Sequence, residues 1–259
     1  MKKLFLIALT FGFTKVMIGQ STEVSIPGSQ TKTFISSIIN GQQYVLQISL
    51  PSGYANSNKK YPVVFLMDSQ RDFPLFTALY GQQYYDGFVP EMITVGITWG
   101  GDHPNPDSLR ARDYTPTTEQ RLPQSGGADK FLDVIRNEVF PLVEKNYRID
   151  ENDKTLVGCS LGGLFTMYTL FTHPEMFNRY VAASPAFMWD NKVLYKYEEQ
   201  YHANKSNPRV SLFICIGSVE TDVPQFEKLT SFLKNRNYPN LKIESKVLEN
   251  TGHSGTNPS

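Results

Sequence analysis

The sequence predicts an α/β fold, in which a mainly parallel β-sheet carries helices on both faces and begins with an antiparallel hairpin. Short apolar runs alternate with longer amphipathic segments along the chain, which is typical of strands joined by helical crossovers. The runs at 61–67 and 92–97 are continuously apolar, as expected for strands buried on both faces. A strand, a sharp turn and a helix also follow one another around Ser160.

The composition is sufficient for one large domain. The chain has 259 residues, of which 40% are hydrophobic, so it can bury a full core. Its 25 basic and 25 acidic residues give a formal net charge of zero. This balance argues against nucleic acid or an anionic membrane surface as the main partner. We expect a small-molecule partner and find no domain boundary within 21–259.

The N-terminus has the pattern of a secretion signal. Two lysines precede an apolar stretch at 4–13, and polar residues follow at 20–22, which predicts a signal peptide at 1–20. Lys15 interrupts the apolar stretch, which is too short to span a bilayer. We therefore expect export to a bacterial periplasm or beyond, with no membrane span after the signal is removed.

The first half of the predicted domain begins with a hairpin. Residues 31–39 and 43–50 are rich in β-formers and are joined across Asn40-Gly41, a strong signal for a tight turn between strands. An aromatic-rich helix is expected at 73–85, between the two buried strands. Loops as long as the one predicted at 99–124 are usually functional or disordered in compact domains. Its aromatic, arginine and aspartate content favours an ordered loop.

The second half alternates helices and strands. Apolar residues recur on one helical face at 126–145, with a kink expected near Pro141. The remaining predicted elements are a strand at 179–183, a helix at 191–203, a strand at 210–216, a helix at 224–235 and a strand at 241–248.

The two cysteines are predicted to be buried free thiols. Cys159 and Cys215 fall in strands that another strand should separate, which places them about 9–10 Å apart across the sheet. That separation is too large for a disulfide.

The segment Gly158-Cys159-Ser160-Leu161-Gly162 has the pattern Gly-x-Ser-x-Gly. Between a strand and a helix, this pattern is typical of the nucleophile elbow of α/β-hydrolases. The tight turn strains the serine backbone, and the flanking glycines keep neighbouring chain from colliding with it. We predict that Ser160 is a nucleophile; the alternative is an ordinary glycine-rich turn.

A serine nucleophile needs a base that is held by an acid. In this fold class the chain order is nucleophile, acid and histidine, each after the carboxyl end of a strand. Of four histidines, His253 alone follows the last predicted strand. The acid should follow the strand that ends at Ile216, which favours Glu220, with Asp222 as the alternative and Asp190 as a more distant one.

The oxyanion of the reaction needs two backbone amides. The Leu161 amide, directly after the nucleophile, is expected to supply one. The second should follow the strand ending at Met67, which indicates Ser69, Gln70 or Arg71 through their backbone.

Several segments together carry a resemblance to a known family: 112–117, 125–131, 158–165, 183–185 with Trp189, and 217–220. They resemble the Putative esterase family of α/β-hydrolases, and within it the ferric-siderophore (enterobactin-type) esterases. The resemblance implies an ester hydrolase with Ser160 as nucleophile, His253 as base and an acid near Glu220. Members of the family cleave siderophore, cinnamoyl, acetyl-sugar and thioester bonds, so the likeness is less specific for substrate.

Two departures from the family pattern stand out. Cys159 occupies a position where such proteins often carry histidine, and its side chain is expected to point into the core. The chain also has only six residues after His253, where relatives continue into a helix that packs on the sheet. This suggests a domain that lacks its C-terminal helix.

Two side chains are candidates for substrate binding. Arg112 could grip a carboxylate or catecholate at the mouth of the site; the alternative is a structural ion pair with Asp113. Trp189, after Ser184-Pro185, could form a wall for an aromatic group, or it could simply pack on the core.

The function predicted from the sequence is that of an exported serine esterase that forms an acyl-enzyme. No metal or cofactor is implied, because the histidines and cysteines lack ligand spacing. Two alternatives remain open: an acyltransferase that uses the same triad, and a catalytically silent ligand-binding protein on this fold.

Overall fold

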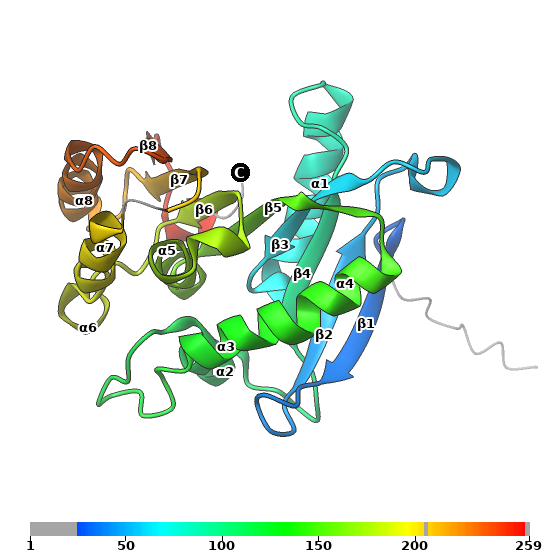
Figure 1. Ribbon diagram of the computed structural model, residues 1–259, viewed down its shortest axis with the longest axis horizontal. Coiled ribbons are helices and arrows are strands. Elements are labelled where there is room, and N and C mark those ends of the chain that lie inside the picture. Colours follow the sequence, from blue (N-terminus) through cyan, green and yellow to red (C-terminus); the bar gives the residue numbers. More distant parts are fainter. Residues whose placement is uncertain (1–24, 205–206, 257–259) are drawn as a thin grey trace, which may run out of the picture.

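The chain is described by a computed structural model over residues 25–204 and 207–256. Within these residues one sheet of eight strands runs through the molecule in the order β1-β2-β4-β3-β5-β6-β7-β8 (Figure 1). This architecture confirms the predicted α/β-hydrolase class. The strands are β1 (Ser29–Ile35), β2 (Gln43–Ser49), β3 (Tyr61–Leu66), β4 (Ile93–Trp99), β5 (Ile149–Cys159), β6 (Arg179–Ala183), β7 (Val210–Gly217) and β8 (Leu241–Leu248).

The strand directions explain where a site can form. β1 and β2 make the predicted antiparallel hairpin, with Gly41 at φ 75° in the turn. β2 also pairs antiparallel with β4, whereas the other neighbouring strands pair in parallel. The segments that leave β3, β5, β6, β7 and β8 therefore all emerge at one edge of the sheet.

Helices cover both faces of the sheet. On one face, Val64 and Leu66 of β3 pack with Phe73 of α1. On the other, Phe65 lies against the rings of Phe140 and Phe177. The main helices are α1 (Ser69–Tyr85), α2 (Pro106–Tyr114), α3 (Ala128–Val134), α4 (Phe140–Asn146), α5 (Leu161–Thr172), α7 (Leu194–Ala203) and α8 (Val223–Asn235), with a short α6 (Trp189–Lys192).

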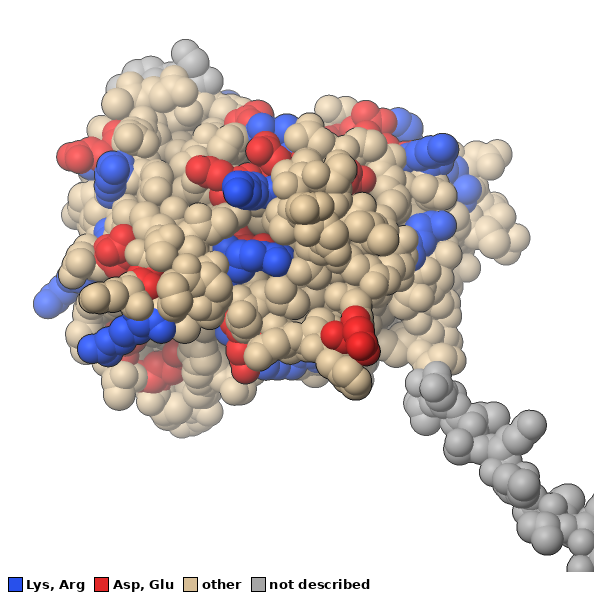
Figure 2. Space-filling view, turned by 90° about the horizontal axis from the view of Figure 1, so that it is seen from below, with Lys and Arg blue, Asp and Glu red and all other residues tan. Residues whose placement is uncertain are grey.

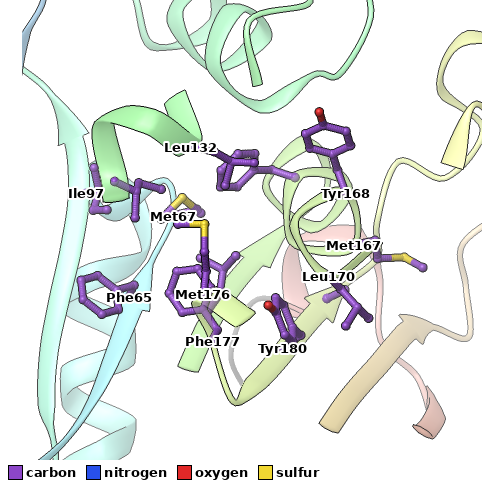
Figure 3. Packing of buried hydrophobic residues seen from close by; sticks show 14 of the residues in the cluster. Phe65, Met67, Ile97, Leu132, Met167, Tyr168, Leu170, Met176, Phe177 and Tyr180 are labelled. Carbon is purple, nitrogen blue, oxygen red and sulfur yellow. The ribbon is translucent and has the colours of Figure 1, made fainter. Parts of the chain in front are cut away.

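The larger core lies between the sheet and the helices that follow α2. Figure 3 shows side chains of β3 and β4 meeting those of α3, α5 and β6 in this cluster. Full burial of one such leucine or phenylalanine contributes about 1.5–3 kcal/mol. The core thus fixes α5 against the strand that precedes it. The labelled side chains are Phe65, Met67, Ile97, Leu132, Met167, Tyr168, Leu170, Met176, Phe177 and Tyr180.

The segment at 99–124 is not a continuous loop, and this part of the sequence prediction was wrong. It contains helix α2, which begins at Pro106. The side chain of Asn105 accepts a hydrogen bond from the Ser108 amide at 3.1 Å. An asparagine cap followed by proline at the first helical position is a normal helix start.

Two other helices differ from their predicted form. The helix expected at 126–145 is interrupted by a π turn at Ile135–Val139, directly before α4. Pro141 is the second residue of α4 and lies directly after this π turn; Val139 and Phe140 before it keep helical backbone angles. α1 begins at Ser69, earlier than expected, and continues through Gly81.

Both cysteines are free and buried, as predicted. Cys159 and Cys215 are each in register with Ala183 of the intervening strand β6. Burial raises the pKa of the Cys159 thiol to about 12 and that of Cys215 to about 11.

Acidic and basic side chains are interspersed over the face seen in Figure 2. No helix within 25–204 and 207–256 is long and apolar enough to cross a bilayer. The predicted signal peptide at 1–20 lies outside the described residues.

Candidate active site

Ser160 occupies a strained turn between β5 and α5. Its backbone adopts φ 58° and ψ −117°, a conformation that costs about 1–3 kcal/mol and persists only where surrounding structure enforces it. The Ser160 amide donates to the Ala183 carbonyl at 3.0 Å, and the Ser160 carbonyl accepts from the Ala186 amide at 3.0 Å. A Cβ at Gly158 would lie 2.3 Å from the Gly162 carbonyl oxygen. The turn therefore requires glycine at 158.

His253 and Glu220 come together from two neighbouring strands. Glu220 follows β7 and His253 follows β8, and these two strands pair in parallel. The Nδ1 atom of His253 lies 2.6 Å from Oε2 of Glu220. Asp222, the alternative acid, is exposed at the start of α8. The structure thus brings Glu220, and not Asp222, to the histidine.

The Glu220 carboxylate is held on both sides. Its Oε1 atom accepts hydrogen bonds from the Ser184 hydroxyl at 2.6 Å and from the Gly217 amide at 2.9 Å. Burial alone would raise the pKa of Glu220, but the hydrogen bonds from Ser184, His253 and Gly217 outweigh it and leave the pKa below its ordinary value. The group is therefore ionised at neutral pH.

The sequence did not reveal two buried hydroxyls beside this pair. Ser184 has φ 38° at the end of β6. Thr256 donates to the His253 carbonyl at 2.7 Å, and its hydroxyl oxygen lies 2.8 Å from that of Ser184. These contacts tie the His253 turn to the residue that holds Glu220. The sequence signal that could have indicated Ser184 is the Ala183-Ser184-Pro185 segment, because it ends a strand at the sheet edge where Ser160, Glu220 and His253 lie.

Ser160 and His253 line a common pocket of about 370 Å³. Asp68 and Arg110 form its inner polar wall through a bidentate ion pair, with distances of 3.1 and 2.8 Å. The complete lining is Asp68, Arg71, Asp72, Leu75, Arg110, Cys159, Ser160, His253 and Ser254.

The predicted oxyanion amides lie at two helix starts. Leu161 is the first residue of α5, while Ser69 and Gln70 are the first two of α1. Amides at these positions have no acceptor within their own helix. The two helix starts are close, because a Cβ on Gly162 would lie 3.3 Å from Asp68 Oδ2. The Asp68 amide is already used, since it donates to the Tyr114 hydroxyl at 3.0 Å.

Arg112 lies outside the lining of this pocket. Its guanidinium donates to the Asp113 carboxylate at 2.6 and 2.9 Å and to Gln42 Oε1 at 2.9 Å. Asp113 is fully buried and also accepts hydrogen bonds from Tyr44 and Trp99. The ion pair with Asp113, which the sequence offered as the alternative for Arg112, is therefore present, and the pocket lining gives no support for a substrate-binding role of Arg112.

The neighbouring Arg110 lines the pocket instead. Residues two apart on an α-helix point about 200° apart, so Arg110 and Arg112 of α2 face different surroundings. Trp189 also lies outside the lining: its indole N–H donates to the Thr117 hydroxyl at 3.2 Å, and its ring packs on the main core.

No group of three His, Cys, Asp or Glu side chains suited to hold a metal occurs in the part of the chain described. The arrangement places a strained serine and a histidine paired with a carboxylate at one pocket, and the predicted oxyanion residues Leu161, Ser69 and Gln70 are next to residues of its lining. These groups are the ones that acyl transfer through a serine requires.

Comparisons with known proteins agree with this chemistry. The sequence model of the family described as "Putative esterase" matches residues 36–255. Over 218 residues the chain is 31% identical to the ferri-bacillibactin esterase BesA of Bacillus subtilis, covering 78% of this chain and 74% of that protein. It is 28% identical to a siderophore triacetylfusarinine C esterase of Aspergillus fumigatus, covering 79% and 73%.

The fold also matches solved structures. The BES protein from Bacillus cereus superposes with a TM-score of 0.82 at 26% identity, covering 91% of this chain and 93% of that one. The siderophore hydrolase EstA from Aspergillus nidulans gives a TM-score of 0.76 at 23% identity, covering 92% and 94%; at that identity the likeness concerns the fold.

Proposed function

Because this chain belongs to the Putative esterase family and is a serine ester hydrolase, we propose that Ser160, His253 and Glu220 form its catalytic triad. The observation that carries the proposal is the 2.6 Å contact between His253 Nδ1 and Glu220 Oε2, beside a strained serine that lines the same pocket. Glu220 holds the imidazole with Nδ1 protonated, which leaves Nε2 to act as the base.

The reaction proceeds in two acyl-transfer steps. His253 takes the Ser160 proton as the Ser160 oxygen attacks the ester carbonyl, and it returns that proton to the leaving alcohol. Water then attacks the acyl-enzyme, with His253 again acting as the base. The ionised Glu220 stabilises the imidazolium that forms in each step.

The negative oxygen of each tetrahedral intermediate is bound by backbone amides. Leu161 supplies one, and Ser69 or Gln70 supplies the other from the start of α1. Loss of one such donor typically lowers kcat by about 10²–10³-fold. The Gln70 side chain is engaged elsewhere, since its Oε1 atom accepts from the Thr98 hydroxyl at 2.9 Å, so this role belongs to the backbone.

We propose that the natural substrates are siderophore esters. The support comes from relatives of this chain, which include a ferri-bacillibactin esterase and a triacetylfusarinine C esterase. Incubation of the chain with these two siderophores, in iron-loaded and iron-free form, followed by mass spectrometry of the products, tests the proposal. Ester cleavage of at least one siderophore is expected; turnover of simple aryl esters alone would contradict it.

We also propose that the chain is exported, on the strength of the leader pattern at 1–20. Expression in a bacterial host, fractionation and N-terminal sequencing test this. Removal of the leader and recovery outside the cytoplasm are expected; an intact N-terminus in the cytoplasmic fraction would contradict it.

The triad is tested most directly with a fluorophosphonate probe, which labels activated serines without any assumption about substrate. The parent chain is expected to be labelled, and Ser160→Ala is expected to lose both labelling and ester hydrolysis, by about 10⁴–10⁶-fold in kcat. Ser231→Ala is the matched control, because Ser231 is exposed on α8. Labelling that survives in Ser160→Ala would contradict the assignment.

A further inference from the structure

The pocket around Ser160 contains four side chains that carry formal charge besides His253: Asp68, Arg71, Asp72 and Arg110. The Asp68 and Arg110 side chains are largely buried, at 7% and 15% exposure, and both guanidinium contacts of Arg110 go to Asp68. Their charges neutralise one another in place. This pair therefore builds the wall and leaves no free charge for a ligand.

Arg71 differs from the other charged groups of the pocket. It lies in the first turn of α1 and is exposed, and its guanidinium makes no hydrogen bond or ion pair with any residue in 25–204 or 207–256. Asp72 follows it directly but is buried. Adjacent residues on a helix do not face each other, so the Arg71 and Asp72 side chains leave α1 in different directions.

Leu75 extends the same surface. It lies four residues after Arg71, on the same face of α1, and it also lines the pocket. Its side chain is 46% exposed and therefore open to contact by a ligand. One wall of the pocket thus presents an unpaired cation and an apolar side chain on successive helical turns.

We propose that Arg71 binds an anionic group, such as a carboxylate, carried by the ester close to the scissile bond, while Leu75 contacts the apolar part of the same substituent. This inference rests on the proposed function of Ser160. The planar guanidinium matches a carboxylate with two parallel hydrogen bonds. In this proposal Arg71 has the anion-binding role that the sequence suggested for Arg112.

Two matched substrate pairs test the proposal. In the first pair the charge is on the acyl side: 4-nitrophenyl 4-carboxybenzoate against its 4-carbamoyl analogue. In the second it is on the alcohol side: 4-acetoxybenzoate against 4-acetoxybenzamide. Each pair keeps nearly the same shape and changes the charge, and kcat/KM is measured for each ester with each variant.

Arg71→Gln is expected to lower kcat/KM for the charged member of at least one pair by about 10- to 100-fold, because a hydrogen bond to a charged group is worth about 1.5–3 kcal/mol. The neutral member should change by less than about twofold, Arg71→Lys should retain part of the preference, and salt should weaken it. Arg209→Gln is the matched control, since Arg209 is exposed at the opposite edge of the sheet, before β7.

Equal losses for charged and neutral esters, or no loss in either pair, would overturn the role of Arg71. Binding of the charged esters to Ser160→Ala, measured by calorimetry with and without Arg71→Gln, gives a readout that needs no turnover. If Ser160→Ala still hydrolyses these esters, the proposed function fails instead. The calorimetric comparison of the two variants then still decides whether Arg71 binds the anion.

Discussion

On the His253 side of the pocket, Ser184 donates to Glu220 at 2.6 Å, Thr256 donates to the His253 carbonyl at 2.7 Å, and the two hydroxyl oxygens lie 2.8 Å apart. On the α1 side, Arg71 is exposed, and its guanidinium has no bonded partner among the residues described. Groups that carry out the same chemistry on every substrate benefit from being held in advance. Side chains that determine substrate preference must stay free to contact the ligand. The His253 side is therefore suited to catalysis, and the α1 side to substrate selection.

The largest loss of kcat on the His253 side is expected from replacing Glu220. Glu220→Gln removes the charge that stabilises the imidazolium and no longer fixes which nitrogen is protonated, so kcat should fall by about 10³–10⁴-fold. Asp222→Asn, two residues away and exposed, should change kcat by less than about threefold. Steady-state kinetics on a neutral aryl ester measures both. Equal effects in the two variants would remove Glu220 from the triad.

The next largest effect is expected from replacing Arg112, and it should be an effect on stability alone. Arg112→Gln leaves the buried Asp113 without its cation, and we expect a loss of about 2 kcal/mol in the free energy of unfolding. Denaturant titration measures this loss. Below the unfolding transition, kcat/KM should stay unchanged for charged and neutral esters alike, whereas Arg71→Gln should lower it for charged esters only. A selective loss with the charged ester in Arg112→Gln would return that residue to the binding site.

Ser184 should produce the smallest effect. Ser184→Ala removes one hydrogen bond from Glu220, and we expect a loss of about 1 kcal/mol in stability together with a kcat about 3- to 10-fold lower. Activity and unfolding measured at neutral pH test both values.

The pH dependence distinguishes this role from simple packing. Because the pKa of Glu220 is depressed in the folded state, its contribution to stability is present above the unfolded pKa and is lost as pH falls through the folded pKa. Without the Ser184 hydroxyl the folded pKa rises, so the parent and Ser184→Ala should differ above about pH 5 and converge in acid. In a Glu220→Gln background, the stability lost on replacing Ser184 with alanine should no longer depend on pH. If that loss is already the same at every pH in the parent background, the Ser184 side chain contributes by packing alone.

Much of the fold could be predicted because its signals are local. Continuous apolar runs give β3 and β4. The glycines at 158 and 162 mark the elbow, and a side chain at 158 would collide with the Gly162 carbonyl. The helix α2 was missed because Pro104 and Pro106 resemble loop residues, although Asn105 between them is a helix cap.

The site was less accessible to sequence reasoning. Which arginine faces the pocket depends on how α1 and α2 are rotated against the sheet, and spacing along the chain does not specify that rotation. Ser184 and Thr256 are separated by 72 positions, and their contact follows only from the pairing of distant strands.

Glu220 and His253 each follow directly on one of two adjacent strands, β7 and β8. Their separation is thus set by the spacing of strands, about 4.8 Å, and not by the length of chain between them. The connection from α8 to β8 lies at the opposite edge of the sheet and contains exposed residues such as Asn237. That turn is therefore a natural point for inserting a fluorescent reporter or an affinity tag, where additional chain would leave the geometry of the acid and the base unaltered.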